Sequence, residues 1–122
     1  MKKFALALDL KENEDLIAEY EAWHKKVPSE IKKSIFDSGI QSMEIYRLGN
    51  RLFMTIETND DFSFERKASL DQSNPHVQEW ERLMWKFQQP LPTAKEGEKW
   101  IHMNKIFELN NKDFLHGSST AK

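Results

Sequence analysis

A glycine–asparagine pair near the middle of the chain, Gly49-Asn50, separates two segments in which apolar and polar side chains alternate. Alternation with a period of two is typical of a strand with one buried face, and a two-residue turn commonly joins antiparallel strands. The pattern therefore predicts a β-hairpin with strands over residues 40–48 and 51–58. Within the first of these strands, Met43 falls on one face and Tyr46 on the other.

Helical segments are predicted on both sides of this hairpin, and each side also carries one further strand. In residues 4–10, bulky side chains alternate with small or acidic ones, so this segment is predicted to be a strand whose bulky face meets helices. Proline and glycine interrupt the helical segments. The predicted helices run from near Asn13 to about Lys26, over 28–39, over 62–69 and over 76–88, and the last strand runs over 100–109.

The resulting order is strand, helix pair, strand, strand, helix pair, strand. This order predicts an α+β fold, a ferredoxin-like βαββαβ sheet with helices on one face. The other face stays open, and a second copy of the chain is the simplest cover for it, which predicts a homodimer. Residues 1–109 are expected to form a single domain, and residues 110–122 a polar C-terminal tail that is frayed.

Composition narrows the function classes. The formal net charge is −2 and cysteine is absent, which excludes disulfides and thiolate sites and argues against nucleic acid as a partner. No stretch approaches the roughly 20 apolar residues of a membrane span. Asp9 interrupts the N-terminal apolar run, so that run is interpreted as a strand and not as a secretion signal. The expectation is a cytoplasmic enzyme or binding domain without a membrane partner.

The segment from Leu16 to Val27 carries the most chemical information. Its apolar and aromatic residues recur at helical spacing and fall on one stripe, and within it Tyr20 and His24 lie four residues apart. Side chains at this spacing lie one above the other on the same helix face. A phenol and an imidazole placed in this way either pack in the hydrophobic core or form a proton-transfer pair that faces a pocket.

Several motifs, taken in order, resemble the L-rhamnose mutarotase family over about residues 1–109. No single motif is specific, and the resemblance rests on their order and spacing. The motifs are E-Y-x-x-x-H ending at His24, Ile45-Tyr46, R-L-F-x-x-x-E over 51–57, V-Q-E-W over 77–80, and Lys105-Ile106-Phe107.

This resemblance implies a dimeric ferredoxin-like α/β barrel that interconverts the α and β anomers of a free 6-deoxyhexose without a metal or cofactor. It assigns His24 as the proton donor and Tyr20 as its catalytic neighbour. It assigns Tyr46 and Trp80 to substrate binding.

The sequence departs from the family pattern at two of the implied substrate-binding positions. Met43 stands where a tyrosine would be, and Glu81 replaces the second of two tryptophans. These departures leave the choice between L-rhamnose and L-fucose open.

Mutarotation opens a pyranose ring, so one group protonates the ring oxygen while another takes the proton of the anomeric hydroxyl. Histidine suits either step near neutral pH. Sugar binding also needs an aromatic platform, which Trp80, Tyr20 and Tyr46 can supply. No phosphate-binding glycine loop and no metalloprotease motif is present.

Each candidate also has a structural interpretation. His24 can be a surface or core-edge histidine, Tyr20 and Trp80 core aromatics, and Glu81 a solvated charge. Trp23 is expected to pack against the second helix. His76, His102 and His116 show no spacing that suggests a metal site.

Two other functions fit the same scaffold. One is a small oxygenase or haem-degrading enzyme, and the other is a sugar-binding dimer without catalysis. Fold alone cannot choose among the three.

Overall fold

The structure is a computed structural model that describes residues 1–111 of the chain. Its elements follow the predicted order, with one additional short strand. They are β1 (Lys2–Leu10), α1 (Glu14–His24), α2 (Ser29–Asp37), β2 (Ile40–Leu48), β3 (Arg51–Thr58), α3 (Phe64–Gln72), α4 (Pro75–Trp85), β4 (Gln88–Gln89) and β5 (Ile101–His102). No helix in this part of the chain is long and apolar enough to cross a membrane.

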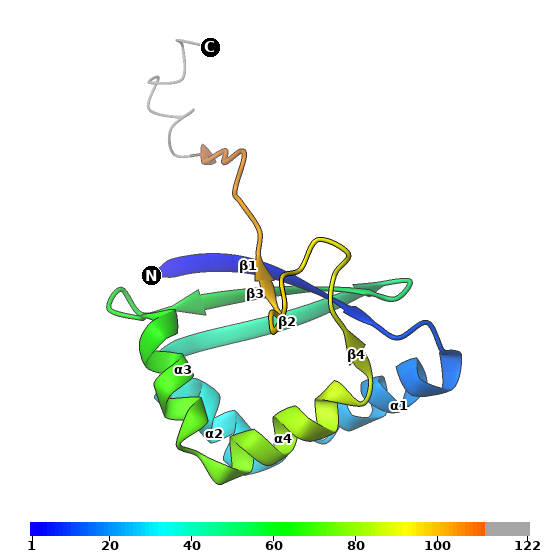
Figure 1. Cartoon of the computed structure of the whole chain (residues 1–122). Coiled ribbons are helices and arrows are strands. Elements are labelled where there is room, and N and C mark those ends of the chain that lie inside the picture. The colour runs from blue at the N-terminus through cyan, green and yellow to red at the C-terminus, as the bar shows by residue number, and fades with distance from the viewer. Residues whose placement is uncertain (112–122) are drawn as a thin grey trace.

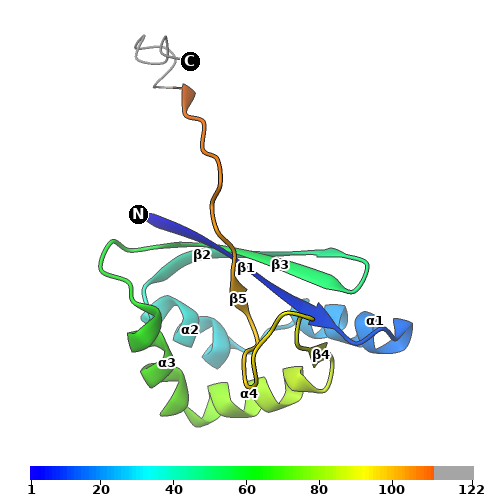
Figure 2. The same ribbon diagram turned by 45° about the horizontal axis from the view of Figure 1, so that its top comes forward.

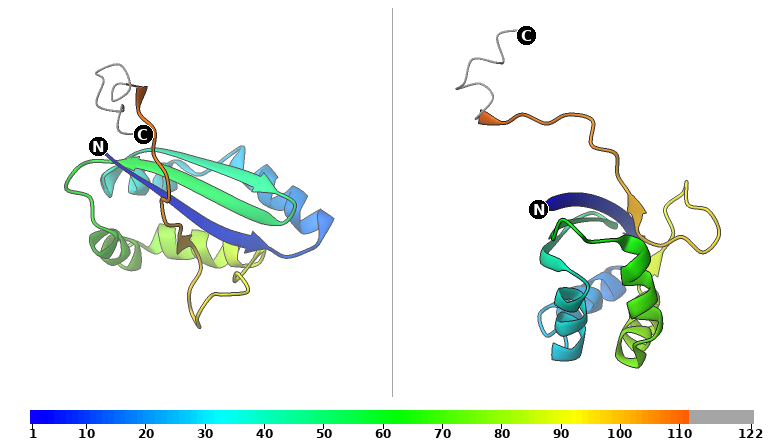
Figure 3. Two further views of the ribbon diagram at one scale, coloured as in Figure 1. Left: turned by 90° about the horizontal axis from the view of Figure 1, so that it is seen from above. Right: turned by 90° about the vertical axis from the view of Figure 1, so that its left-hand side faces the viewer.

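The strands form a single antiparallel sheet. Its order is β2-β3-β1-β4, and β5 also pairs with β1. Leu6 of β1 lies opposite Met54 of β3, and Met54 lies opposite Ile45 of β2. The four helices all lie on one face of this sheet (Figures 1 and 3). The α+β, ferredoxin-like architecture predicted from the sequence is confirmed.

Local sequence accounts for the bounds of most elements. Gly49 has φ +58°, a conformation that suits a tight hairpin turn and that glycine adopts without strain. The side chain of Asn13 accepts a hydrogen bond from the backbone N–H of Leu16 at 3.0 Å and so caps α1. Asn74 caps α4 in the same way, with Pro75 in its first turn.

The core lies between the sheet and the helices, on the bulky face of β1 as predicted. Leu8 and Leu10 are fully buried there. Two clusters make up this core, and Trp100 packs against both of them. The first comprises Leu10, Tyr20, Leu52, Met84 and Phe87, and the second comprises Leu6, Ile40, Ile56 and Phe62.

The end of the described chain differs from prediction. The strand expected over 100–109 is reduced to Ile101–His102, and after Met103 the chain leaves the sheet (Figure 2). The free edge of β1 is divided between β4, opposite Asp9 and Leu10, and β5, opposite Leu6 and Ala7. Gln88, expected at the end of a helix, instead forms β4 with Gln89. His116 and the rest of the predicted tail from residue 112 lie outside the described residues.

Candidate active site

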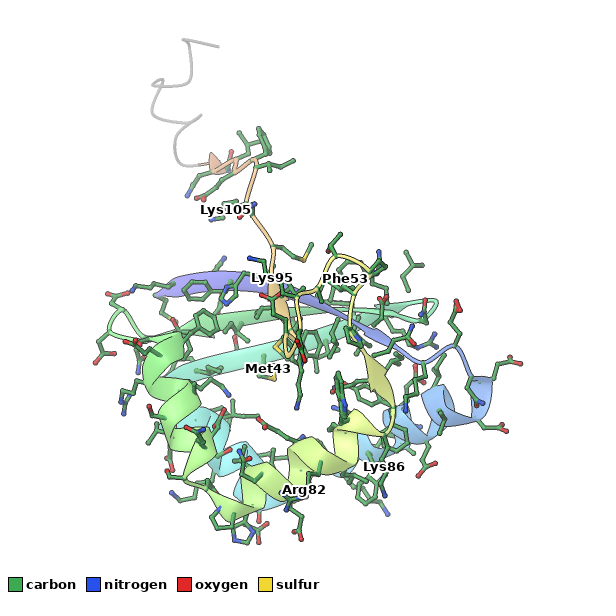
Figure 4. All side chains as sticks on the ribbon, viewed as in Figure 1. Met43, Phe53, Arg82, Lys86, Lys95 and Lys105 are labelled. Atoms are coloured by element: carbon green, nitrogen blue, oxygen red, sulfur yellow. The ribbon has the colours of Figure 1, made fainter. Side chains whose placement is uncertain are left out.

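A cavity of about 360 Å³ lies between the sheet and the helices. Its apolar wall comes from the strands and includes Leu6, Met43 and Met54. Figure 4 shows Met43 directed from β2 toward the helical layer. The helices supply the opposite wall, and with it most of the polar and aromatic side chains that face the cavity.

Tyr20 and His24 both line this cavity from α1. Their ring centroids are 4.4 Å apart, as the helical spacing predicts. The Nδ1 of His24 lies 2.9 Å from the backbone carbonyl oxygen of Tyr20. Because a carbonyl can only accept, Nδ1 carries the hydrogen, and the neutral imidazole keeps its lone pair on Nε2. The backbone of α1 thus selects the tautomer and leaves Nε2 to exchange a proton with a ligand.

Tyr20 is almost fully buried, with 4% of its surface exposed. Burial raises the pKa of its phenol, and the hydrogen bond from Gln88 opposes this shift more weakly. The Nε2 of Gln88 donates to the phenol oxygen at 3.5 Å, so the phenol hydrogen stays available to a ligand. Tyr20 is therefore a neutral donor at physiological pH.

Trp80 of α4 brings an indole ring to the same cavity. Its ring centroid lies 5.8 Å from that of His24 and 6.2 Å from that of Trp23, both in edge-on geometry. Trp23, which the sequence predicted against the second helix, lies edge-on to Trp80 of α4. Such a ring, half-buried beside an imidazole, is suited to the apolar face of a ligand.

Of the six predicted site residues, the structure brings five to the cavity, and these are Tyr20, His24, Met43, Trp80 and Glu81. Tyr46 is not among them. Side chains three apart on a strand point to opposite faces, so Tyr46 lies on the open face while Met43 faces the helices. There Tyr46 is exposed and donates to Glu44 at 3.1 Å, and this carboxylate raises the pKa of the phenol.

Sequence reasoning missed several polar residues of the cavity. Gln88 was assigned to a helix end, and His102 was weighed only as a metal ligand. The ion pair between Lys67 and Asp71 on α3 also lines the cavity, as does Lys99 from the loop before β5. The i,i+4 spacing of the ion pair is visible in the sequence, but its position beside a cavity is not.

A second hollow, of about 740 Å³, lies on the open face of the sheet. It is lined by charged and polar side chains such as Lys3, Glu44 and Glu57, and it lacks the tyrosine–histidine pair. Within residues 1–111, no group of three or more histidine, aspartate or glutamate side chains is placed to hold a metal ion. The cavity that brings Tyr20 and His24 together is therefore the candidate active site.

Comparisons with known proteins identify the family of the chain. Residues 3–109 match the family described as L-rhamnose mutarotase. The chain is 38% identical over 123 aligned positions to a protein named L-fucose mutarotase from Xanthomonas campestris pv. campestris, covering 99% of this chain and 98% of that one.

Two solved structures share the fold at low sequence identity. The L-rhamnose mutarotase of Formosa agariphila has a TM-score of 0.67 and 18% identity, covering 90% of this chain and 100% of that one. Tetracenomycin F2 cyclase of Streptomyces glaucescens has a TM-score of 0.56 and 16% identity, with the same coverage. As the sequence predicts, the chain belongs to the L-rhamnose mutarotase family and is an isomerase of the mutarotase class.

Proposed function

We propose that the cavity between the sheet and the helices interconverts the α and β anomers of a free 6-deoxyhexose, with L-fucose preferred over L-rhamnose. The observation that carries this proposal is the stacked pair Tyr20 and His24 at a cavity of about 360 Å³. The preference for L-fucose is supported by the 38% identity, over nearly the whole chain, to the Xanthomonas protein of that name.

In this proposal the exchanged proton moves through Nε2 of His24. The imidazolium protonates the ring oxygen as the bond between that oxygen and the anomeric carbon breaks, and the carboxylate of Glu81 takes the proton of the anomeric hydroxyl. Closure of the open-chain aldehyde on its other face reverses both transfers, so atoms and charge balance. Tyr20 donates a hydrogen bond to the sugar, and Glu81 accepts one from a sugar hydroxyl. Positioned proton transfer of this kind contributes about 10²–10⁴-fold in rate.

The cavity itself favours a sugar over the rival ligands. Its volume lies at the lower end of the roughly 300–1,000 Å³ typical of small-molecule sites, which suits a single pyranose better than a haem macrocycle. Met43 and Met54 form an apolar surface for the methyl group and C–H bonds of a deoxy sugar, and Trp80 adds an aromatic wall.

Saturation-transfer NMR on free sugars tests the proposal directly. The protein should speed anomer exchange of L-fucose well above the buffer rate, L-rhamnose more slowly, and ordinary hexoses least. Binding without faster exchange would support a non-catalytic sugar-binding protein instead. A haem absorption spectrum that changes on adding the protein, together with no exchange activity, would support the oxygenase alternative.

The proposal also includes the expectation that the chain forms a homodimer and acts in the cytoplasm. Support comes from the open sheet face, which carries no helix within residues 1–111 and exposes Tyr46 and Leu48. Exposed apolar side chains gathered on one face are typical of an interface. We expect light scattering coupled to gel filtration to give twice the 14.5 kDa mass of one chain. A monomer mass across micromolar concentrations would contradict this part of the proposal.

Tyr46 provides a test of which sheet face is catalytic. Tyr46→Phe removes only a hydroxyl that bonds Glu44 on the open face, so the exchange rate should stay within about twofold, as for surface changes of small energetic effect. The rate is measured by the same NMR exchange experiment at a fixed L-fucose concentration. A tenfold fall would show that the open face takes part in the reaction.

A further inference from the structure

One ion pair at the cavity has no role in the proton transfers. Lys67 and Asp71 lie one turn apart on α3, with Nζ and Oδ2 2.5 Å apart. Only 26% of the lysine side chain and 14% of the aspartate side chain is exposed, and both residues line the cavity. The amide of Gln78 donates to the backbone carbonyl of Asp71 at 2.9 Å, which ties the end of α3 to α4.

Helix stability does not account for this placement. Pairs at i,i+4 stabilise a helix weakly, and a lysine that precedes the acid is the less favourable order. Partial burial of both charges adds a desolvation cost. The same pair recurs on α2, where Lys33 and Asp37 have the same spacing and order at 2.6 Å, but with 76% and 57% of their side chains exposed. The two pairs differ in that one faces the cavity.

The position of the pair complements that of the acid–base residues. α1, which carries His24, and α3, which carries the ion pair, lie at opposite ends of the helical layer, with α4 between them (Figure 1). A pyranose whose anomeric carbon lies at His24 therefore directs its distant hydroxyl groups toward α3. An ammonium donates to such hydroxyls and a carboxylate accepts from them, in charge-assisted hydrogen bonds.

We propose that Lys67 and Asp71 bind the adjacent C3 and C4 hydroxyl groups of the sugar and so select its stereochemistry. This inference rests on the proposed function. L-fucose carries these two hydroxyls in cis arrangement, whereas its C4 epimer, 6-deoxy-L-glucose, carries them in trans. The ammonium and the carboxylate are held 2.5 Å apart, so together they can bind two vicinal hydroxyls. The C4 hydroxyl projects in a different direction in the two epimers, so a pair placed for one epimer does not reach both hydroxyls of the other. In this proposal the two charged residues of α3 thus distinguish L-fucose from its C4 epimer.

Asp71→Asn and Lys67→Gln test this inference, because both keep side-chain size and remove charge. Each should raise KM for L-fucose about 10- to 100-fold, the loss expected for a hydrogen bond to a charged group, with kcat little changed. Each should also reduce the preference for L-fucose over 6-deoxy-L-glucose. Rates come from NMR exchange at varied sugar concentration, and thermal unfolding reports whether each variant folds.

The exposed pair on α2 supplies a matched control. Asp37→Asn and Lys33→Gln delete the same charges at the same helical spacing, so they should leave KM and sugar preference unchanged. The inference is overturned if the α3 variants fold and keep the wild-type KM and preference, or if the α2 variants shift them equally. If one α3 variant fails to fold, the KM and the sugar preference of the other variant test the inference. A wild-type protein without exchange activity would instead contradict the proposed function.

Discussion

Replacement of His24 by alanine is expected to lower the anomer-exchange rate by about 10²–10⁴-fold, the usual contribution of a positioned acid–base group. His24 is half-buried, and its hydrogen bond from Nδ1 to the Tyr20 carbonyl holds the ring so that Nε2 exchanges the proton. Alanine removes the imidazole and keeps the helix, since alanine has the highest helix propensity. The rate is measured by saturation-transfer NMR with L-fucose, at equal concentrations of folded protein.

His76 provides the control for this substitution. It lies exposed in the first turn of α4 and is not among the residues that line the cavity. His76→Ala therefore removes the same group from the surface and should leave the rate unchanged. A His24→Ala protein that folds and exchanges anomers at the wild-type rate would show that proton transfer runs through another group, and Tyr20 and Glu81 would be the next candidates.

Tyr20 sets an upper limit on the pH range of the reaction. Burial raises the pKa of its phenol above the ordinary value near 10. The phenol therefore stays protonated across the neutral range, and its role as a donor does not change there. Any rate change with pH below the ordinary phenol pKa must come from other groups, which makes the His24 variant the informative one.

The pattern of neighbouring residues was sufficient to predict the hairpin. The strands predicted over 40–48 and 51–58 coincide with β2 and β3, because the period-two alternation and the glycine turn are properties of adjacent residues. The placement of Tyr20 and His24 on one face is equally local, since the pitch of a helix determines it. Whether that face meets a cavity or a sealed core depends on the sheet packed against it, and no local pattern contains this information.

Tyr46 shows how two sequence arguments can disagree. The alternation within residues 40–48 placed Met43 and Tyr46 on opposite faces, whereas the family resemblance assigned both to the substrate. The structure follows the alternation, because the register with β3 puts Tyr46 opposite Phe53 and Met43 opposite Ile56. Figure 4 shows Phe53 on the side of the sheet away from Met43. The role of Tyr46 in substrate binding stays a prediction.

The errors at the end of the chain have a different origin. A strand was predicted over residues 100–109, but a strand also needs a partner edge, and the edge of β1 is shared by β4 and β5. Pairing of this kind joins residues far apart in sequence. The ion pair between Lys67 and Asp71 was missed for the same reason: its spacing is local, but its partial burial depends on the contact between α3 and α4.

Phe87→Ala is expected to lower the free energy of unfolding by about 3–5 kcal/mol, the range for truncating a buried aromatic. Phe87 is 2% exposed and belongs to the cluster that contains Tyr20, Leu10 and Leu52. Its ring centroid lies 6.1 Å from that of Tyr20, so truncation to alanine removes a neighbour of this ring on α1. Urea unfolding followed by tryptophan fluorescence measures the change, with an unchanged m-value as evidence of two-state behaviour.

Phe36 of α2 is the matched control, because 59% of its surface is exposed. Phe36→Ala should change the free energy of unfolding by no more than about 0.5 kcal/mol, as for other surface positions. A loss below about 1 kcal/mol for Phe87→Ala would mean that the core collapses around the truncated site.

The exchange rate of the folded Phe87→Ala protein then separates two roles of the ring. A fall in kcat at full folding would show that Phe87 positions Tyr20, whereas an unchanged kcat would confine its role to stability.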